Sequence, residues 1–216
     1  ELVSQFRCNG SDGYLAWLDN TLDIRKTANW DMQDIDYDIQ IMDSPHDVRN
    51  IILEKNVASN NKARLLAGYC WDWPKAGRNK TTEPDIIIGD FKMSWNLENT
   101  STFAIDENSV NEIGCIHSSQ GLEFDYVGVI IGEDLRYEDG KVVTDFTKRA
   151  KTDQSLKGIK KLHKENPEKA QKAADEIIKN TYRTLMTRGM KGCYVYCVDE
   201  NLSEYLKSSI GKEEES

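Results

Sequence analysis

The alternation of apolar and polar positions along the chain predicts strands and helices that follow one another in turn. Residues 37–42 alternate as a half-buried strand does. Ser44 and Pro45 then open a helix through about Asn56, with apolar positions one or two turns apart. Residues 64–70 form an apolar run typical of the next strand. A strand, a helix and a second strand of these lengths predict a βαβ unit and therefore a parallel sheet.

Helical spacing marks three further segments. Leu15, Leu18 and Leu22 fall on one face of a helix near the start of the chain. Residues 167–185 carry the longest helical pattern, which begins with a proline and ends just before a glycine. Residues 202–210 predict a last short helix. These helices are long enough to cover the faces of the predicted sheet.

Two more strands flank a short segment of small polar residues. Residues 112–116 and the β-branched run 126–132 predict core strands, and Ser-Ser-Gln-Gly lies between them. Such a loop brings hydroxyls, an amide and a glycine backbone to a sheet edge, where α/β domains bind ligands. A further strand is expected at residues 192–198. The whole order favours a doubly wound α/β domain with a mostly parallel sheet flanked by helices.

An insertion is expected within this domain, over residues 133–165. It begins with Asp139-Gly140 between β-favouring residues, which predicts a small β-hairpin. It continues into a basic stretch, residues 148–164, whose only acidic residue is Asp153. That stretch is either a solvated surface or a contact for a phosphate backbone, and the net charge of −9 for the chain makes its local excess of lysine notable.

Composition narrows the class of protein. No apolar run approaches the roughly 18 residues of a membrane span, so no membrane partner is expected. The five cysteines include no Cys-x-x-Cys pair, and Cys115, Cys193 and Cys197 fall in strand-like runs, which predicts small buried hydrophobic side chains and no metal site. An odd number of cysteines suits a reducing, cytoplasmic location.

Three segments resemble motifs of the superfamily 1 helicases. Residues 117–125, His-Ser-Ser-Gln-Gly-Leu-Glu-Phe-Asp, resemble motif V, and residues 185–195, Leu-Met-Thr-Arg-Gly-Met-Lys-Gly-Cys-Tyr-Val, resemble motif VI. Residues 5–7, Gln-Phe-Arg, are similar to motif IV. Their order is that of the family. The likeness covers nearly the whole of residues 1–216 and points to the second, C-terminal RecA-like domain of bacterial helicase-like ATP-binding proteins related to the Schlafen helicase domain, with the fold of P-loop NTPases.

The resemblance implies a nucleotide site. Arg188 matches the arginine finger of motif VI, and Arg7 matches the arginine of motif IV; both would contact phosphates of ATP. Glu123 matches the carboxylate that accepts hydrogen bonds from the ribose hydroxyls. The other nucleotide-binding positions carried over are Gly121, Gln120 and Thr187. A helix cap with a surface ion pair is the alternative role for Arg188.

The same resemblance implies contact with single-stranded DNA or RNA. His117, Ser118 and Ser119 match residues that face the strand in the family. Gln120 stands where the family has lysine, so this position cannot supply the same positive charge. We add Lys157, Lys160 and Lys161 of the basic stretch as candidate phosphate contacts.

The motifs that would hold Mg²⁺ and the phosphates of ATP are not found in this sequence. It contains no Gly-x-x-x-x-Gly-Lys-[Ser/Thr], and no apolar strand ends in Asp-Glu. The chain, which starts at Glu1, is therefore expected to be part of a longer protein, with ATP and Mg²⁺ bound against a missing N-terminal RecA-like domain. Alone, we expect it not to hydrolyse ATP and to bind it more weakly than about 1 mM.

Two other functions remain open at the level of sequence. Pro84-Asp85 followed by Asp90-Phe91-Lys92 resembles the signature of a metal-dependent nuclease, with two carboxylates for Mg²⁺ and a lysine for the water. Alternatively, the chain is a non-catalytic RecA-like module for protein contacts, in which the motifs serve packing.

Overall fold

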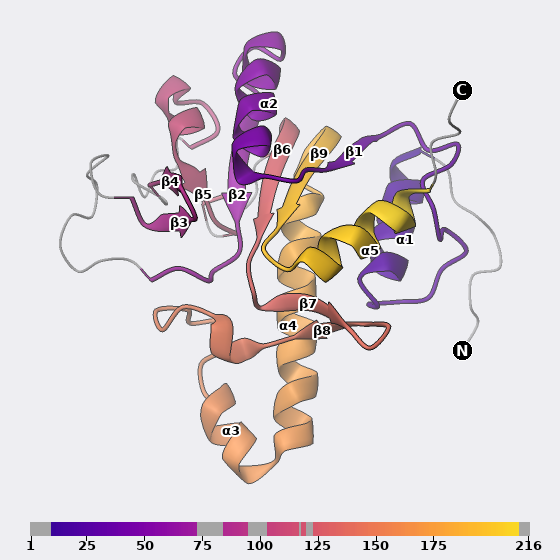
Figure 1. The fold of residues 1–216 in the computed structure, drawn as a ribbon, viewed down its shortest axis with the longest axis vertical. Helices are drawn as coiled ribbons and strands as arrows, with labels where there is room; N and C mark the ends of the chain where they lie inside the picture. Colours follow the sequence, from indigo (N-terminus) through magenta and orange to yellow (C-terminus); the bar gives the residue numbers. More distant parts are fainter. Residues whose placement is uncertain (1–9, 73–83, 95–102, 117, 120–122, 212–216) are drawn as a thin grey trace.

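A parallel sheet organises the chain. The computed structural model describes residues 10–72, 84–94, 103–116, 118–119 and 123–211. Within them, five strands form one sheet in the order β1-β9-β6-β2-β5, and every neighbouring pair is parallel (Figure 1). The strands are β1 Asp38–Ile41, β2 Ala63–Ala67, β5 Ile113–Gly114, β6 Phe124–Ile131 and β9 Gly189–Cys197. The predicted α/β fold with a mainly parallel sheet is confirmed.

Helices lie on both faces of the sheet (Figure 1). One hydrophobic cluster joins one face to α1 Gly10–Thr21, α4 Pro167–Met186 and α5 Glu200–Ile210. The other joins the opposite face to α2 Pro45–Ala58 and to a small hairpin. Strand β6 serves both clusters by strict alternation. Val127, Val129 and Ile131 point to the first, and Ile130 points to the second, as expected of a central strand buried on both sides.

The sequence signals that predicted α2, α4 and the βαβ unit correspond to the observed structure. Ser44 caps α2 by accepting hydrogen bonds from the backbone N–H groups of His46 and Asp47 at 3.1 and 3.3 Å. The apolar positions of α4 are buried along one face, namely Ala170, Ala174, Ile178, Tyr182, Leu185 and Met186. The predicted βαβ unit is present, although β9 and β6 separate β1 from β2.

Two antiparallel hairpins flank the sheet. The predicted hairpin after β6 consists of β7 Leu135–Glu138 and β8 Lys141–Thr144, and both turn residues, Asp139 and Gly140, have positive φ. The second pairs β3 Ile86–Ile88 with β4 Phe91–Met93. Short 3-10 turns, η1 Glu107–Asn111 and η2 Phe146–Lys148, and a short helix, α3 Ile159–Glu165, complete the described elements.

The interior contains the three cysteines expected there. Cys115, Cys193 and Cys197 are buried and carry free thiols. Burial raises the pKa of the Cys193 and Cys197 thiols well above the ordinary value, so both stay neutral. Among the described helices none is both long and apolar enough to cross a bilayer.

A buried ionic network holds residues 133–165 together and joins them to α4. The guanidinium of Arg149 donates to Asp134 at 3.1 Å and to Asp153 at 2.8 Å, and its side chain is 3% exposed. The Tyr182 hydroxyl of α4 donates to the other oxygen of Asp134. A methyl group added at Gly68 would lie 1.9 Å from the Tyr182 oxygen, so glycine is needed for this close approach.

Replacing Arg149 by methionine should lower the free energy of unfolding by about 3–5 kcal/mol, because Asp134 and Asp153 would remain buried without their cation. Urea denaturation of the purified chain measures this. Lys148→Met is the matched control. Lys148 pairs with Glu133 at the surface, at 3.4 Å, so its loss should cost at most about 1 kcal/mol. Equal costs for the two variants would contradict the assignment.

Candidate functional site

The amino ends of β6 and β9 bring the two main motifs together. The backbone N–H of Phe124 donates a hydrogen bond to the carbonyl oxygen of Arg188 at 3.0 Å, and Phe124 pairs with Gly189 in the ladder. Glu123 precedes the first of these strands and Arg188 precedes the second. The predicted ribose contact and the predicted arginine finger therefore lie beside one another at one edge of the sheet, and Glu123 is exposed there.

A β-bulge shapes this edge. From Phe124 to Tyr126 the chain of β6 advances two residues, while β9 advances three, from Gly189 to Gly192. The extra residue re-aims the side chains that follow Arg188. Gly189 is required in the bulge, because a Cβ atom there would lie 2.2 Å from the Gly192 carbonyl oxygen. Lys191 emerges from it and pairs with Asp125 at 3.3 Å.

Two tyrosines fix the backbone on either side of Arg188. The Tyr14 hydroxyl donates to the carbonyl oxygen of Met186 at 2.7 Å, and the Tyr37 hydroxyl donates to that of Gly189 at 2.8 Å. Their rings stack with centroids 3.8 Å apart. Burial raises the pKa of both phenols above the ordinary value, so both remain donors. We call this pair of contacts the tyrosine clamp.

The tyrosine clamp could not be found by sequence reasoning. Tyr14 lies 172 positions from Met186, and Tyr37 lies 152 positions from Gly189. Each tyrosine fits its own predicted element as an ordinary core residue. No local signal distinguishes them.

Thr187 ends α4. Its hydroxyl donates to the carbonyl oxygen of Thr184 at 3.0 Å, and its backbone N–H caps the last turn. The side chain thus orders the loop that carries Arg188. In this arrangement its hydroxyl is engaged within the helix end.

The Arg188 side chain is half-buried and only partly satisfied. Its Nε is buried and has no hydrogen-bond partner among the described residues. A buried donor of this kind costs about 1–3 kcal/mol when it stays unpaired. An anionic oxygen, such as that of a nucleotide phosphate, is an acceptor that suits a guanidinium. The arrangement therefore fits the nucleotide that the motifs imply.

The other arginine near this edge differs. Arg183, five positions earlier on α4, donates from its Nε to Asp19 of α1. Arg25 reaches the second oxygen of the same carboxylate at 3.0 Å. Arg183 is thus committed to a structural ion pair.

The turn after β5 uses its hydroxyls internally. Ser119 is fully buried, and its N–H and hydroxyl both donate to the carbonyl oxygen of Cys115, at 3.1 and 3.0 Å. The Ser118 hydroxyl accepts from the Cys115 N–H at 2.7 Å and is half-buried. The predicted direct contact of Ser119 with a nucleic-acid strand disagrees with this burial. Its hydrogen bonds to Cys115 instead stabilise the turn. His117, Gln120, Gly121 and Arg7 lie outside the described residues.

The predicted lysines lie at the opposite end of the domain. Lys160 and Lys161 are on α3 and Lys157 lies just before it, and α3 packs against the first part of α4 (Figure 1). Helix α4 has 20 residues and is therefore about 30 Å long, with Arg188 just beyond its far end. The lysines and the described motif V residues, all predicted as nucleic-acid contacts, therefore lie at different ends of the domain.

The basic stretch also contains an arginine that is not available to a ligand. Arg149 is buried between Asp134 and Asp153. Six exposed lysines of the stretch remain, namely Lys148, Lys151, Lys157, Lys160, Lys161 and Lys164, and of these Lys148 is paired with Glu133.

The nuclease alternative is not supported. Asp85 lies before β3 and Asp90 lies in the turn between β3 and β4, so the two carboxylates are at opposite ends of a hairpin strand. Asp90 accepts a hydrogen bond from His46 Nε2 at 2.9 Å, and this contact lowers the pKa of the carboxyl. Within the described ranges no group of three His, Cys, Asp or Glu side chains could hold a metal ion.

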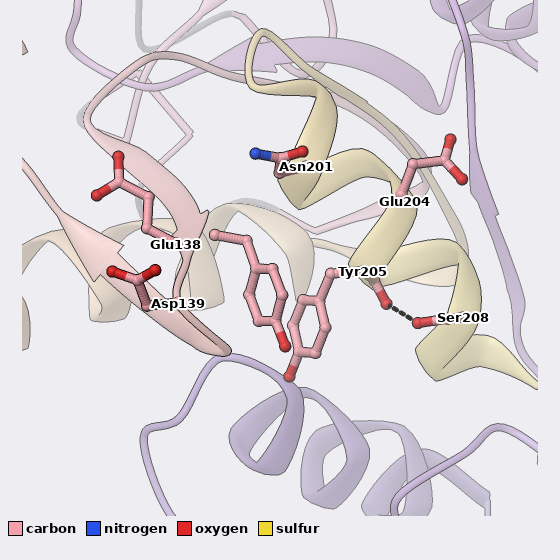
Figure 2. A pocket seen from close by; sticks show the side chains of 7 residues that line it. Glu138, Asp139, Asn201, Glu204, Tyr205 and Ser208 are labelled. Atoms are coloured by element: carbon pink, nitrogen blue, oxygen red, sulfur yellow. Dashed lines mark hydrogen bonds between the residues drawn. The ribbon is translucent and has the colours of Figure 1, made fainter.

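An open hollow of about 720 Å³ lies elsewhere, between the β7–β8 hairpin and α5 (Figure 2). Tyr137 and Tyr205 stack there with ring centroids 4.1 Å apart. Glu138, Asp139 and Glu204 line it as well. Its acidic rim is unsuited to phosphate groups, so it is not a second candidate for the nucleotide.

Comparison with known proteins agrees with the motifs. The chain is 26% identical over 221 residues to the uncharacterized protein YPL245W of Saccharomyces cerevisiae, covering 95% of this chain and 47% of that protein. It thus spans about half the length of the curated relative it matches. No solved structure matches the chain. Residues 1–199 match the family described as Schlafen group 3, DNA/RNA helicase domain, and the chain belongs to that family.

Proposed function

We propose that this chain is the second RecA-like domain of a helicase-like ATPase. It would supply Arg188 and Glu123 to ATP held mainly by a preceding domain of the same protein. The observation that carries the proposal is the hydrogen bond from the Phe124 N–H to the Arg188 carbonyl, which sets the two motif residues side by side. The family, whose members are helicase domains, implies the use of ATP.

The proposed role of Arg188 follows from its surroundings. Its backbone is held by the tyrosine clamp and by Phe124, so the guanidinium starts from a fixed base. A prepositioned cation can stabilise charge that develops on transferring phosphoryl oxygens without first being reoriented. The unpaired Nε would gain its acceptor only when the nucleotide and the preceding domain are in place.

Glu123 suits the ribose. An ionised carboxylate accepts hydrogen bonds at two oxygens, and a ribose offers two neighbouring hydroxyl donors. Glu123 is exposed at the amino end of β6, so its side chain is accessible. Arg7 would add a second phosphate contact, and Gln120, Gly121 and Thr187 would shape the loops around the nucleotide. Mg²⁺ would be held by the preceding domain.

Contact with single-stranded DNA or RNA would occur at the loop that follows β5. His117 and Ser118 would face the strand, and Ser119 would hold the turn from inside. This loop runs directly into β6, whose first residue bonds to Arg188. If binding of the nucleic-acid strand shifts this loop, the shift would move Arg188 through its hydrogen bond with Phe124. Such a path is what coupling of strand binding to ATP hydrolysis requires.

In the full-length protein that contains this chain, Arg188→Ala should lower kcat for ATP hydrolysis by about 10³-fold or more. Steady-state phosphate release measures this. Arg25→Ala is the matched control, because Arg25 is an exposed arginine that pairs with the buried carboxylate of Asp19, and it should leave kcat unchanged. An unaltered kcat in the Arg188 variant, with folding intact, would reject the proposal.

The tyrosine clamp yields a separate expectation. Tyr14→Phe and Tyr37→Phe each remove one hydroxyl and leave a carbonyl oxygen beside Arg188 without its donor, at a cost of about 1–3 kcal/mol in the free energy of unfolding. If the clamp positions Arg188, kcat of the full-length protein should also fall, with little change in KM.

Tyr205→Phe provides the matched control for these variants. Its hydroxyl donates to the carbonyl oxygen of Thr21 at 2.7 Å, a bond of the same kind at a different place. It should cost similar stability and leave kcat unchanged. Equal kcat values for all three variants would limit Tyr14 and Tyr37 to a role in stability.

A further inference from the structure

A basic arm projects from the carboxyl end of the sheet. It comprises residues 146–165, from η2 to the end of α3, and with the start of α4 it extends beyond the sheet (Figure 1). Its exposed lysines are Lys148, Lys151, Lys157, Lys160, Lys161 and Lys164. Lys148 pairs with Glu133 at 3.4 Å, and the other five have no ion pair with another described residue. Its acidic residues are Asp153, which is bound to Arg149, and Glu165. The arm is thus strongly positive in a chain of net charge −9.

Three of these lysines surround one hollow. Lys151, Lys157 and Lys160 line a cavity of about 340 Å³. Phe146 and Leu156 supply apolar lining in the same cavity. The volume lies in the range of small-ligand sites, about 300–1,000 Å³.

The arm is held in place by buried charge. Arg149 and Asp153 also line this hollow, and the bond from Arg149 to Asp134, which follows the end of β6, ties the arm to the carboxyl end of that strand. The backbone N–H of Ala150 also donates to the carbonyl oxygen of Tyr69, after β2, at 2.8 Å. The hollow therefore exists before any ligand arrives, which lowers the ordering cost of binding.

We propose that the basic arm is a second binding site for single-stranded nucleic acid, separate from the loop after β5. Phosphates would lie against Lys151, Lys157 and Lys160, and one base would enter the hollow against Phe146 and Leu156. A positive groove with an apolar or aromatic platform is the usual way to bind single strands without regard to sequence. A duplex keeps its bases stacked inside and cannot fill the hollow.

This site and the motif edge cannot be one contact. Strand β6 runs the length of the sheet between them and has eight residues, which gives a separation of about 26 Å. The proposal needs no nucleotide and no preceding domain, so it can hold even if the proposed ATPase role fails.

The test uses fluorescence anisotropy of the purified chain with labelled single-stranded DNA, single-stranded RNA and duplex DNA of equal length. The variant K151Q/K157Q/K160Q should bind both single strands at least about tenfold more weakly at low salt, and its plot of log K against log salt should lose about 2 units of slope, because three phosphate contacts are removed. The matched control is K26Q/K92Q/K141Q, which removes the same charge from exposed lysines outside the arm and should bind like the parent chain.

Phe146→Leu tests the base contact. It keeps apolar bulk and removes the ring, so affinity for single strands should fall about fivefold, in keeping with the loss of one stacking contact, while the salt slope stays the same. This binding should need no added nucleotide, which separates the arm from the proposed ATP site. Urea midpoints close to that of the parent chain establish that the variants are folded.

Two results would overturn the proposal. One is equal loss of affinity in the arm variant and in the control triple variant, which would mean that net charge alone governs binding. The other is duplex binding as tight as single-strand binding together with no effect of Phe146→Leu, which would reduce the arm to a general basic surface.

Discussion

The hydrogen bond between the Phe124 N–H and the Arg188 carbonyl is the constraint on which the candidate site depends. It is an ordinary bond of a parallel ladder, and its net worth is only about 1 kcal/mol. Its importance is geometric. It sets the register of β6 against β9 at their amino ends, and the residues just before the two strands must then share one edge. The bulge in β9 and the hydrogen bonds of the two tyrosines restrain the same backbone segment, from Met186 to Gly189. Together with the Phe124 bond they fix the position of the Arg188 backbone.

The two ends of the sheet are held by different kinds of interaction. At the amino end neutral groups predominate, because tyrosine hydroxyls and backbone N–H groups satisfy backbone carbonyls. At the carboxyl end the chain is held by ion pairs between a buried guanidinium and two carboxylates. A buried ion pair costs free energy to form, and removing one partner costs still more. Neutral hydrogen bonds add no charge to their surroundings. At the amino end the Nε of Arg188 has no hydrogen-bond partner among the described residues, whereas at the carboxyl end the buried charges hold the start of the arm.

Sequence reasoning succeeded where the signal is local. The serine and proline at the start of α2, the Asp-Gly turn of the hairpin and the apolar stripe of α4 each depend on residues within a few positions of one another, and each was found in place. It failed where the determinant is distant. The burial of Arg149 depends on Asp134, 15 positions away, and nothing in a lysine-rich stretch marks one member as internal. The location of Lys157, Lys160 and Lys161 depends on how α3 packs on α4. The pairing of β3 with β4 went unpredicted because each has only three residues.

The arginines of this domain show how a structural cation can be told from a candidate functional one. Arg64 is fully buried and donates hydrogen bonds to backbone carbonyls and to the side-chain oxygens of Asn56 and Asn61. Arg149 spends its donors on two carboxylates and a serine hydroxyl. In both cases the cost of burial is offset inside the chain. Arg188 combines a firmly held backbone with a buried Nε that no described residue satisfies. The Nε of Arg49 is buried and unpaired among the described residues as well, so Arg188 is distinguished by its position, at the amino end of β9 beside Glu123.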